Sequence, residues 1–294
     1  MSCIFNNSTN RRKGRRKRTN KPKKLINVFC LFFLIVIIFT GKNMLINKSQ
    51  STQGVYKAQK TASNVTNIVK HKKKNIELNK YNRKYKNYSI DASKAYTLAN
   101  SKLAFLTFDD GPTPNVTPEI LNVLKKYNVK ATFFVLGNLV EQNKDILKRI
   151  VNEGHALGNH SYSHDYHKIY SNINSFVNEI NKTSETIKNV VGEHYVPKLV
   201  RFPGGSFGKD KNIFKNKLKQ EDYSYVDWNA LTGDAEGQNI PPLKLINNLK
   251  KTTANKKHVV ILMHDAATKK TTVQALPGVI EYLKQEKYNF KTLK

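Results

Sequence analysis

The sequence predicts an α/β fold with a mostly parallel sheet, closed or nearly closed as a barrel, behind a basic N-terminal region that contains one apolar run. From about residue 101, short strands rich in aromatic and β-branched residues alternate with amphipathic helical stretches. Residues 25–41 form an apolar run interrupted only by Asn27. Of the 51 Lys and Arg residues, 23 precede residue 101, together with only two acidic residues. The chain therefore combines a globular domain with a strongly basic N-terminal region.

Three segments precede the predicted domain: a basic tail at 1–24, an apolar segment at 25–41 and a basic linker at 42–100. The tail holds ten basic residues, so the positive-inside rule keeps it in the cytosol and exports the rest of the chain. The apolar run is at the short end for a transmembrane helix, and no small-x-small cleavage pattern follows it. We expect a single-pass signal-anchor in the cell membrane, with a cleaved signal peptide and a secreted protein as the alternative.

Charge and cysteine content argue against two classes of site. The basic excess concentrates in the tail and linker and does not alternate with aromatic residues in the folded domain, so we expect no nucleic-acid partner. No obligate protein partner is inferred either. The two cysteines, Cys3 and Cys30, precede the domain expected at 101–294, which excludes disulfides and cysteine metal sites there.

Hydrophobic periodicity assigns five strands and five helices to residues 101–294. The strands are expected at Leu103–Phe108, Ala131–Leu136, Leu199–Phe202, Tyr223–Trp228 and Val259–Met263. The helices are expected from Thr117 to about Tyr127, from Val140 to Glu153, from Ile173 to Val191, from Pro242 onward and from Val273 to Lys287. Ligand sites in such parallel folds lie at the C-terminal ends of the strands.

An aspartate pair and two histidines form a candidate metal site. Asp109 and Asp110 follow the first strand, and His160 and His164 are four residues apart, so that both can face one side of a helical turn. One Asp and two His can hold a divalent metal and leave positions open for water and substrate. The alternative for the aspartates is a capped turn before Gly111-Pro112.

Five short segments carry a resemblance to a known family. They are Thr107-Phe108-Asp109-Asp110-Gly111-Pro112, His160-Ser161-Tyr162-Ser163-His164, Arg201-Phe202-Pro203-Gly204-Gly205, Asp227-Trp228 followed by Asp234, and Leu262-Met263-His264-Asp265. In order and spacing they resemble the polysaccharide deacetylases with a NodB-homology domain, carbohydrate esterase family 4. The resemblance covers residues 101–294 and implies a distorted (β/α) barrel.

The resemblance implies a metal site and a base. Asp110, His160 and His164 would bind the metal, which is commonly zinc in this family, although such a ligand set also accepts Co²⁺, Ni²⁺, Mn²⁺ or Fe²⁺. Asp109 would be the general base that takes a proton from the metal-bound water. Arg201 would pair with Asp109 and hold its orientation, with a surface salt bridge as the alternative for this arginine.

The resemblance also implies an acid and a substrate surface. His264 would be the general acid that protonates the leaving nitrogen, with Asp234 raising its pKa. The backbone N–H of Gly204 would help to stabilise the oxyanion. Leu262 would line the pocket for the acetyl methyl group, and Trp228 would contact the substrate.

The expected function is metal-dependent removal of N-acetyl groups from N-acetylglucosamine residues of an acetylated envelope polysaccharide, with peptidoglycan as the first choice. The alternatives are an O-acetyl esterase of the xylan type, a chitin-oligomer deacetylase and a non-catalytic glycan-binding wall protein. Many relatives carry Trp directly after the residue that corresponds to Asp234, whereas this chain has Ala235. The residue that forms the substrate wall at this point is therefore not assigned.

Overall fold

The structure, a computed structural model, describes residues 59–70, 72, 89–97 and 101–294. The chain divides into two compact units, Met1–Asn67 and Ile68–Lys294. The described residues of the first unit, 59–67, are helical. No helix in the described part of the chain is long and apolar enough to cross a membrane. The expected tail at 1–24 and anchor at 25–41 lie outside the described residues.

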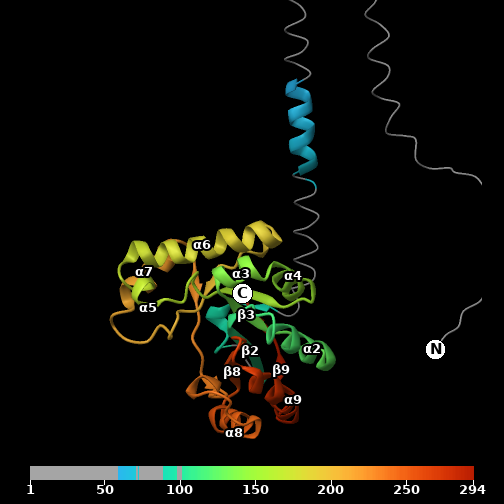
Figure 1. The fold of residues 1–294 in the computed structure, drawn as a ribbon, viewed down its shortest axis with the longest axis vertical. Coiled ribbons are helices and arrows are strands. Elements are labelled where there is room, and N and C mark those ends of the chain that lie inside the picture. Colours follow the sequence, from blue (N-terminus) through green and yellow to red (C-terminus); the bar gives the residue numbers. More distant parts are fainter. Residues whose placement is uncertain (1–58, 71, 73–88, 98–100) are drawn as a thin grey trace, which may run out of the picture. The chain divides into compact units, whose positions relative to one another are not determined.

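The second unit contains a curled sheet of eight parallel strands (Figure 1). The strands are β2 (Leu103–Gly111), β3 (Thr132–Val135), β4 (Ala156–Asn159), β5 (Leu199–Val200), β6 (Ser224–Tyr225), β7 (Ala230–Leu231), β8 (His258–His264) and β9 (Asn289–Phe290). Their order is β6-β5-β4-β3-β2-β8-β7, and β9 pairs with β2. Among the described residues, β6 and β7 do not pair with each other. The sheet is therefore a half-barrel, consistent with the expected distorted (β/α) barrel.

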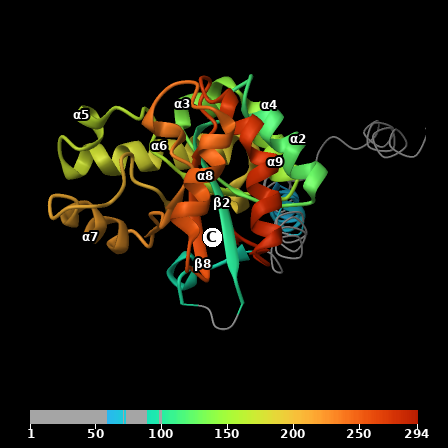
Figure 2. The same cartoon turned by 90° about the horizontal axis from the view of Figure 1, so that it is seen from below.

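Helices form the outer layer of this unit. They are α2 (Thr117–Tyr127), α3 (Gly137–Gln142), α4 (Lys144–Asn152), α5 (Tyr166–Ile169), α6 (Ile173–Val191), α7 (Asn212–Gln220), α8 (Pro242–Thr253) and α9 (Lys270–Gln285). Neighbouring helices contact one another in the order α8, α9, α2, α4, α6 and α7. Figure 2 shows α8 and α9 side by side along the sheet. This arrangement leaves the carboxyl ends of the strands free to carry polar residues.

Strand β2, which carries the two aspartates, is packed against apolar residues on both faces. Leu106 and Phe108 are fully buried in the cluster that includes residues of α2, α4 and α9. Phe105 belongs to a second buried cluster with Phe134. Successive side chains of a strand point to opposite faces, so Asp109 lies on the same face as Phe105. Apolar burial on both faces thus fixes the strand that carries the aspartates.

Residues 89–97, which the sequence analysis placed in the linker, are part of the folded unit. β1 (Ser89–Ile90) pairs in parallel with β10 (Thr292–Leu293). Ala92 and Ala95 are buried in the same cluster as Phe105. The expected boundary at residue 101 is therefore too late, because this short segment carries too little periodicity to reveal its partner at the end of the chain.

Other elements also differ from expectation, since α5, α7, β4, β7 and β9 were not predicted. The single helix expected at 140–153 is two helices, because the chain turns at Asn143, whose side chain donates to the carbonyl of Pro112 at 3.0 Å. The sequence analysis missed β4, which has no β-branched residue. Its Gly158 makes room for the ring of Phe134, which a Cβ would approach to 2.2 Å.

Candidate active site

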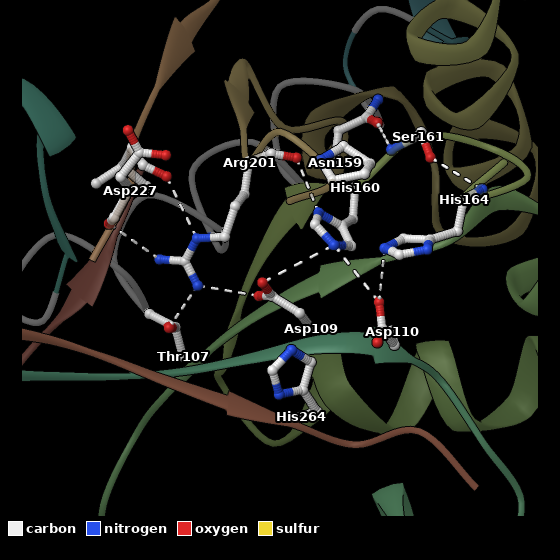
Figure 3. A network of polar contacts seen from close by, with 12 residues as sticks. Thr107, Asp109, Asp110, Asn159, His160, Ser161, His164, Arg201, Asp227 and His264 are labelled. Carbon is white, nitrogen blue, oxygen red and sulfur yellow. Dashed lines mark hydrogen bonds and ion pairs between the residues drawn. The ribbon is translucent and has the colours of Figure 1, made fainter. Parts of the chain in front are cut away.

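The polar residues gather at the carboxyl edge of the sheet (Figure 3). Asp109 of β2 lies in register with His264 of β8. The register of β2 with β3 shifts between Asp109 and Gly111, and Asp110 between them has a φ of 74°. This irregularity breaks the alternation of the strand, so both carboxylates lie at the same edge.

Asp110, His160 and His164 converge as a candidate metal-ligand set. The Nε2 atoms of His160 and His164 lie 3.5 and 3.3 Å from Oδ1 of Asp110. One ligand atom from each residue lies within 4.8 Å of the other two. Oδ1 of Asp110 is buried and accepts no hydrogen bond. Two imidazole nitrogens that face one such carboxylate oxygen fit the donor set of a divalent metal.

The two histidines lie on a turn after β4, and the helical turn that their spacing suggested is absent from this described segment. Ser161 and His164 have φ values of 74° and 57°, outside the helical range. Nδ1 of His160 lies 2.8 Å from the carbonyl oxygen of Arg201, which can only accept, so Nδ1 carries the proton. Nε2 of His160 is therefore the ring nitrogen left to bind a metal beside Asp110.

Burial and neighbouring charges shift the pKa values of these three groups. Burial raises the pKa of Asp110, but His160 and His164 outweigh it and hold that pKa well below its usual range. Burial lowers the pKa of His164, and the neighbouring His160 lowers it further. Burial also lowers the pKa of His160, but Asp109 and Asp110 raise it overall. Metal ligands are ionised carboxylates and neutral imidazoles. A cation bound here would therefore compete with the protonation of His160.

Arg201 is fully buried behind Asp109, so the surface alternative for this arginine is wrong. Its Nη1 donates to Oδ1 of Asp109 at 2.9 Å and to Oγ1 of Thr107 at 2.6 Å. Its Nε and Nη2 donate to the carbonyls of Val226 and Asp227 at 3.3 and 3.4 Å. The guanidinium is held on all sides, and it fixes the orientation of the Asp109 carboxylate. The sequence analysis missed Thr107 in this network.

His264 and Asp234 form a second charged pair. Nδ1 of His264 lies 2.9 Å from Oδ1 of Asp234, and the backbone N–H of His264 donates to Oδ2 at 2.8 Å. Thr272 donates to the same Oδ2 at 2.8 Å. Burial lowers the pKa of His264, but Asp234 outweighs it and raises that pKa to about 9. The imidazole is therefore protonated at neutral pH, next to the two aspartates in Figure 3.

Known proteins are similar to this chain in sequence and fold. The family model for polysaccharide deacetylase matches residues 98–226. A peptidoglycan-N-acetylglucosamine deacetylase of Bacillus cereus is 32% identical over 275 residues, which span 92% of this chain and 93% of the relative. This chain belongs to the polysaccharide deacetylase family. It is a hydrolase, as the five sequence segments predicted, and both the family and the enzyme class are confirmed.

Solved structures of the family share the fold of this deacetylase. A CE4 esterase of Streptococcus mutans is 35% identical, with a TM-score of 0.65 over 71% of this chain and 93% of that chain. The catalytic domain of a peptidoglycan N-acetylglucosamine deacetylase from Eubacterium rectale is 29% identical, with a TM-score of 0.61 over 70% of this chain and 93% of that chain.

The residues expected to meet the substrate of the deacetylase lie beside these groups. Leu262 is 8% exposed on β8, two residues before His264. Gly204 follows β5 with a φ of 75°, which favours glycine. Trp228 is partly buried, and its ring lies 5.9 Å from Cζ of Arg201. Ala235, at the position where many relatives have Trp, is exposed.

Two exposed aromatic residues near this surface were missed by the sequence analysis. Tyr166 is 47% exposed, and its ring meets that of His164 edge-on, with centroids 5.3 Å apart. Phe207 is 58% exposed and packs edge-on against Trp228 at 5.4 Å. The position of Tyr166, two residues after His164, was the one signal in the sequence. Aromatic rings offer apolar faces to a bound ligand.

Proposed function

We propose that this deacetylase removes N-acetyl groups from N-acetylglucosamine residues of peptidoglycan, with the help of a divalent metal. The observation that carries the proposal is a candidate metal-ligand triad, an oriented carboxylate and a protonated imidazole at one edge of the sheet. The relatives from Bacillus cereus and Eubacterium rectale, both named as peptidoglycan deacetylases, support this polymer as substrate.

Asp110, His160 and His164 would hold the metal, with Zn²⁺ as the first candidate and Co²⁺, Ni²⁺, Mn²⁺ and Fe²⁺ as alternatives. A divalent metal held by these residues would supply Lewis-acid chemistry, which activates water and polarises a carbonyl. The hydrogen bond from Nδ1 of His160 to the carbonyl of Arg201 fixes the ring that presents Nε2. The backbone N–H of Gly204 is the second proposed donor to the oxyanion.

Asp109 accepts a proton from the attacking water in this proposal. Its Oδ1 is bound to Arg201, whereas its Oδ2 lies 3.8 Å from Nε2 of His160, close to the ligand set. The carboxylate is therefore held beside the metal ligands with one oxygen available. An oriented carboxylate within reach of the water is the geometry that general base catalysis needs.

His264 donates the proton that the leaving nitrogen requires. In Figure 3 its ring lies on the other side of Asp109 and Asp110 from His160 and His164. The products are acetate and a free amine on the sugar. Leu262 is the proposed contact for the acetyl methyl group and Trp228 a proposed contact for the sugar.

The test is acetate release from N-acetylated peptidoglycan by the full chain, with and without chelator. Asp109→Asn should abolish release, whereas Asp145→Asn, at a position 95% exposed on α4, should leave it unchanged. Release that depends on metal and on Asp109 supports the proposal. Release only from acetylated xylan or from chitin oligomers would favour those alternatives, and no release at all would favour a glycan-binding protein.

The proposed location is the outer side of the cell membrane, with residues 25–41 as anchor and the tail at 1–24 in the cytosol. The support is the ten basic residues ahead of the apolar run. Protease added to intact cells should remove the catalytic domain and leave a small membrane-bound fragment. Enzyme found only in the culture medium would instead indicate cleavage and secretion.

A further inference from the structure

The turn that carries the two candidate metal ligands rests on a buried carboxylate of α6. The backbone N–H groups of Tyr162 and Ser163 donate to Oε2 of Glu179 at 3.0 and 2.7 Å. The hydroxyl of Ser163 donates to the same oxygen at 2.9 Å. The Glu179 side chain is only 3% exposed. These contacts lie between His160 and His164 in sequence, so Glu179 binds the middle of the turn.

The second oxygen of Glu179 is also satisfied. Nζ of Lys168, just after the turn, lies 2.7 Å from Oε1. Burial raises the pKa of Glu179, but Lys168 and Ser163 outweigh it and hold that pKa below its usual value. Glu179 is thus an ionised carboxylate that accepts charge-assisted hydrogen bonds, which are stronger than neutral ones.

Helix α6 holds the start of the turn as well. The side chain of Asn159 accepts from the N–H of Ser161 at 3.0 Å and donates to the carbonyl of Ile180 at 2.9 Å. Ser161 and His164 both have left-handed φ values, which non-glycine residues adopt only when the surroundings impose them. The contacts with α6 supply that constraint, since they fix the backbone between the two residues.

We propose that Glu179 is a positioning residue for metal binding, which holds the turn in the shape that points both Nε2 atoms at Asp110. It touches neither substrate nor ligand atoms, and the proposal rests on the metal site in the proposed function. Partners that orient metal ligands typically contribute 10- to 100-fold in metal affinity. Glu179→Ala should therefore weaken metal binding by about 10- to 100-fold, and Glu179→Gln, which keeps one acceptor oxygen, by less.

The test is titration of the metal-free full chain with Zn²⁺ against a chromophoric chelator. Glu185→Gln is the matched control, because Glu185 lies on α6 with its side chain 61% exposed. We expect the control to keep the wild-type affinity. Excess Zn²⁺ should restore much of the lost activity of the Glu179 variants. Circular dichroism of each variant without metal establishes that it is folded, and Glu179→Gln carries the test where the alanine variant does not fold.

The outcomes separate this inference from the function on which it rests. A wild-type chain that binds no divalent metal would overturn the proposed function and the inference with it. A wild-type chain that binds Zn²⁺, together with a folded Glu179 variant of equal affinity, would overturn the positioning role alone. A lower affinity in the Glu179 variants and not in Glu185→Gln supports it.

Discussion

Asp234 binds both the ring and the backbone of His264. One carboxylate oxygen lies 2.9 Å from Nδ1, and the other accepts the backbone N–H at 2.8 Å. The two residues are 30 positions apart in sequence, yet this double contact fixes the ring and leaves Nε2 for a substrate. The pair therefore sets both the position and the charge of the proposed acid.

Asp234→Asn should move the alkaline limb of kcat toward lower pH. In the folded protein the pKa of His264 is raised from 6.5 to about 9, and burial alone would lower it. Without the Asp234 carboxylate, only Asp109 and Asp110 still oppose the effect of burial, so the imidazole should lose its proton at a lower pH. The measurement is kcat across the neutral and alkaline range. Thr272→Val removes one hydrogen bond to Asp234 but leaves the Asp234 carboxylate charged. This control should therefore shift the alkaline limb of kcat much less.

The same pair should make stability pH-dependent. A histidine whose pKa is raised on folding contributes stability that is complete below pH 6.5 and is lost as the pH rises through about 9. Urea unfolding of the wild type should show this loss, and Asp234→Asn should show a flatter profile. An unchanged kcat limb and an unchanged stability profile in Asp234→Asn would contradict the pairing.

Arg201→Met should lower the free energy of unfolding by about 3–5 kcal/mol, because it leaves the buried Asp109 without its partner. Lys217→Met is the control, since it breaks a pair with Glu221 whose side chains are 30% and 46% exposed. Solvent screens that surface pair, so its loss should cost much less stability than the loss of the Arg201 pair. The measurement is urea unfolding of both variants. Equal losses of unfolding free energy would show that the Arg201 pair does not stabilise the fold.

The sequence predicts which residues meet at the site better than it predicts their local geometry. Asp109 and Asp110 could be placed at the carboxyl end of a predicted strand, although β2 itself continues to Gly111. The helical turn expected for His160 and His164 was wrong, because the left-handed residues there are not glycines and carry no signal. Glu179 looked like an ordinary residue of a predicted helix, since its partners are backbone groups of a distant turn.

In the fold, too, the elements determined by their own sequence could be predicted, and those determined by distant partners could not. Helix α6 begins and ends where its periodicity predicts, because one apolar stripe determines it. Strand β4 could not be found, because Gly158 is explained only by the ring of Phe134 from the neighbouring strand. Residues 89–97 were misassigned for the same reason, as their pairing partner is at the other end of the domain.

Metal should stabilise the wild type against heat, and Asp110→Asn should abolish this effect. A ligand that binds only the folded state stabilises it by about 2.7 kcal/mol at 100 times its Kd. The measurement is the Tm of the metal-free protein with and without added Zn²⁺. Asp165→Asn, at an exposed position near the turn, is the control and should keep the full shift. A Zn²⁺-dependent shift that survives in Asp110→Asn would place the metal elsewhere.

Phe207→Ala should raise the KM for peptidoglycan with little change in kcat. The ring is 58% exposed and packs edge-on against Trp228, so it can cover a sugar without contributing to the chemistry. An aromatic contact of this kind contributes about 0.5–1.5 kcal/mol, or roughly a 2- to 10-fold change in KM. The control is Leu243→Ala, at a position 68% exposed on α8.

A comparison of substrates sharpens this last prediction. A small acetyl ester reaches the acid and base without covering Phe207, so its KM should be unchanged in Phe207→Ala. The KM for the polymer should rise, because the lost contact is with sugar rings and not with the acetyl group. A fall in kcat on both substrates would instead mean that the ring supports the position of Trp228 over Arg201, and the residue would then belong to the framework of the site.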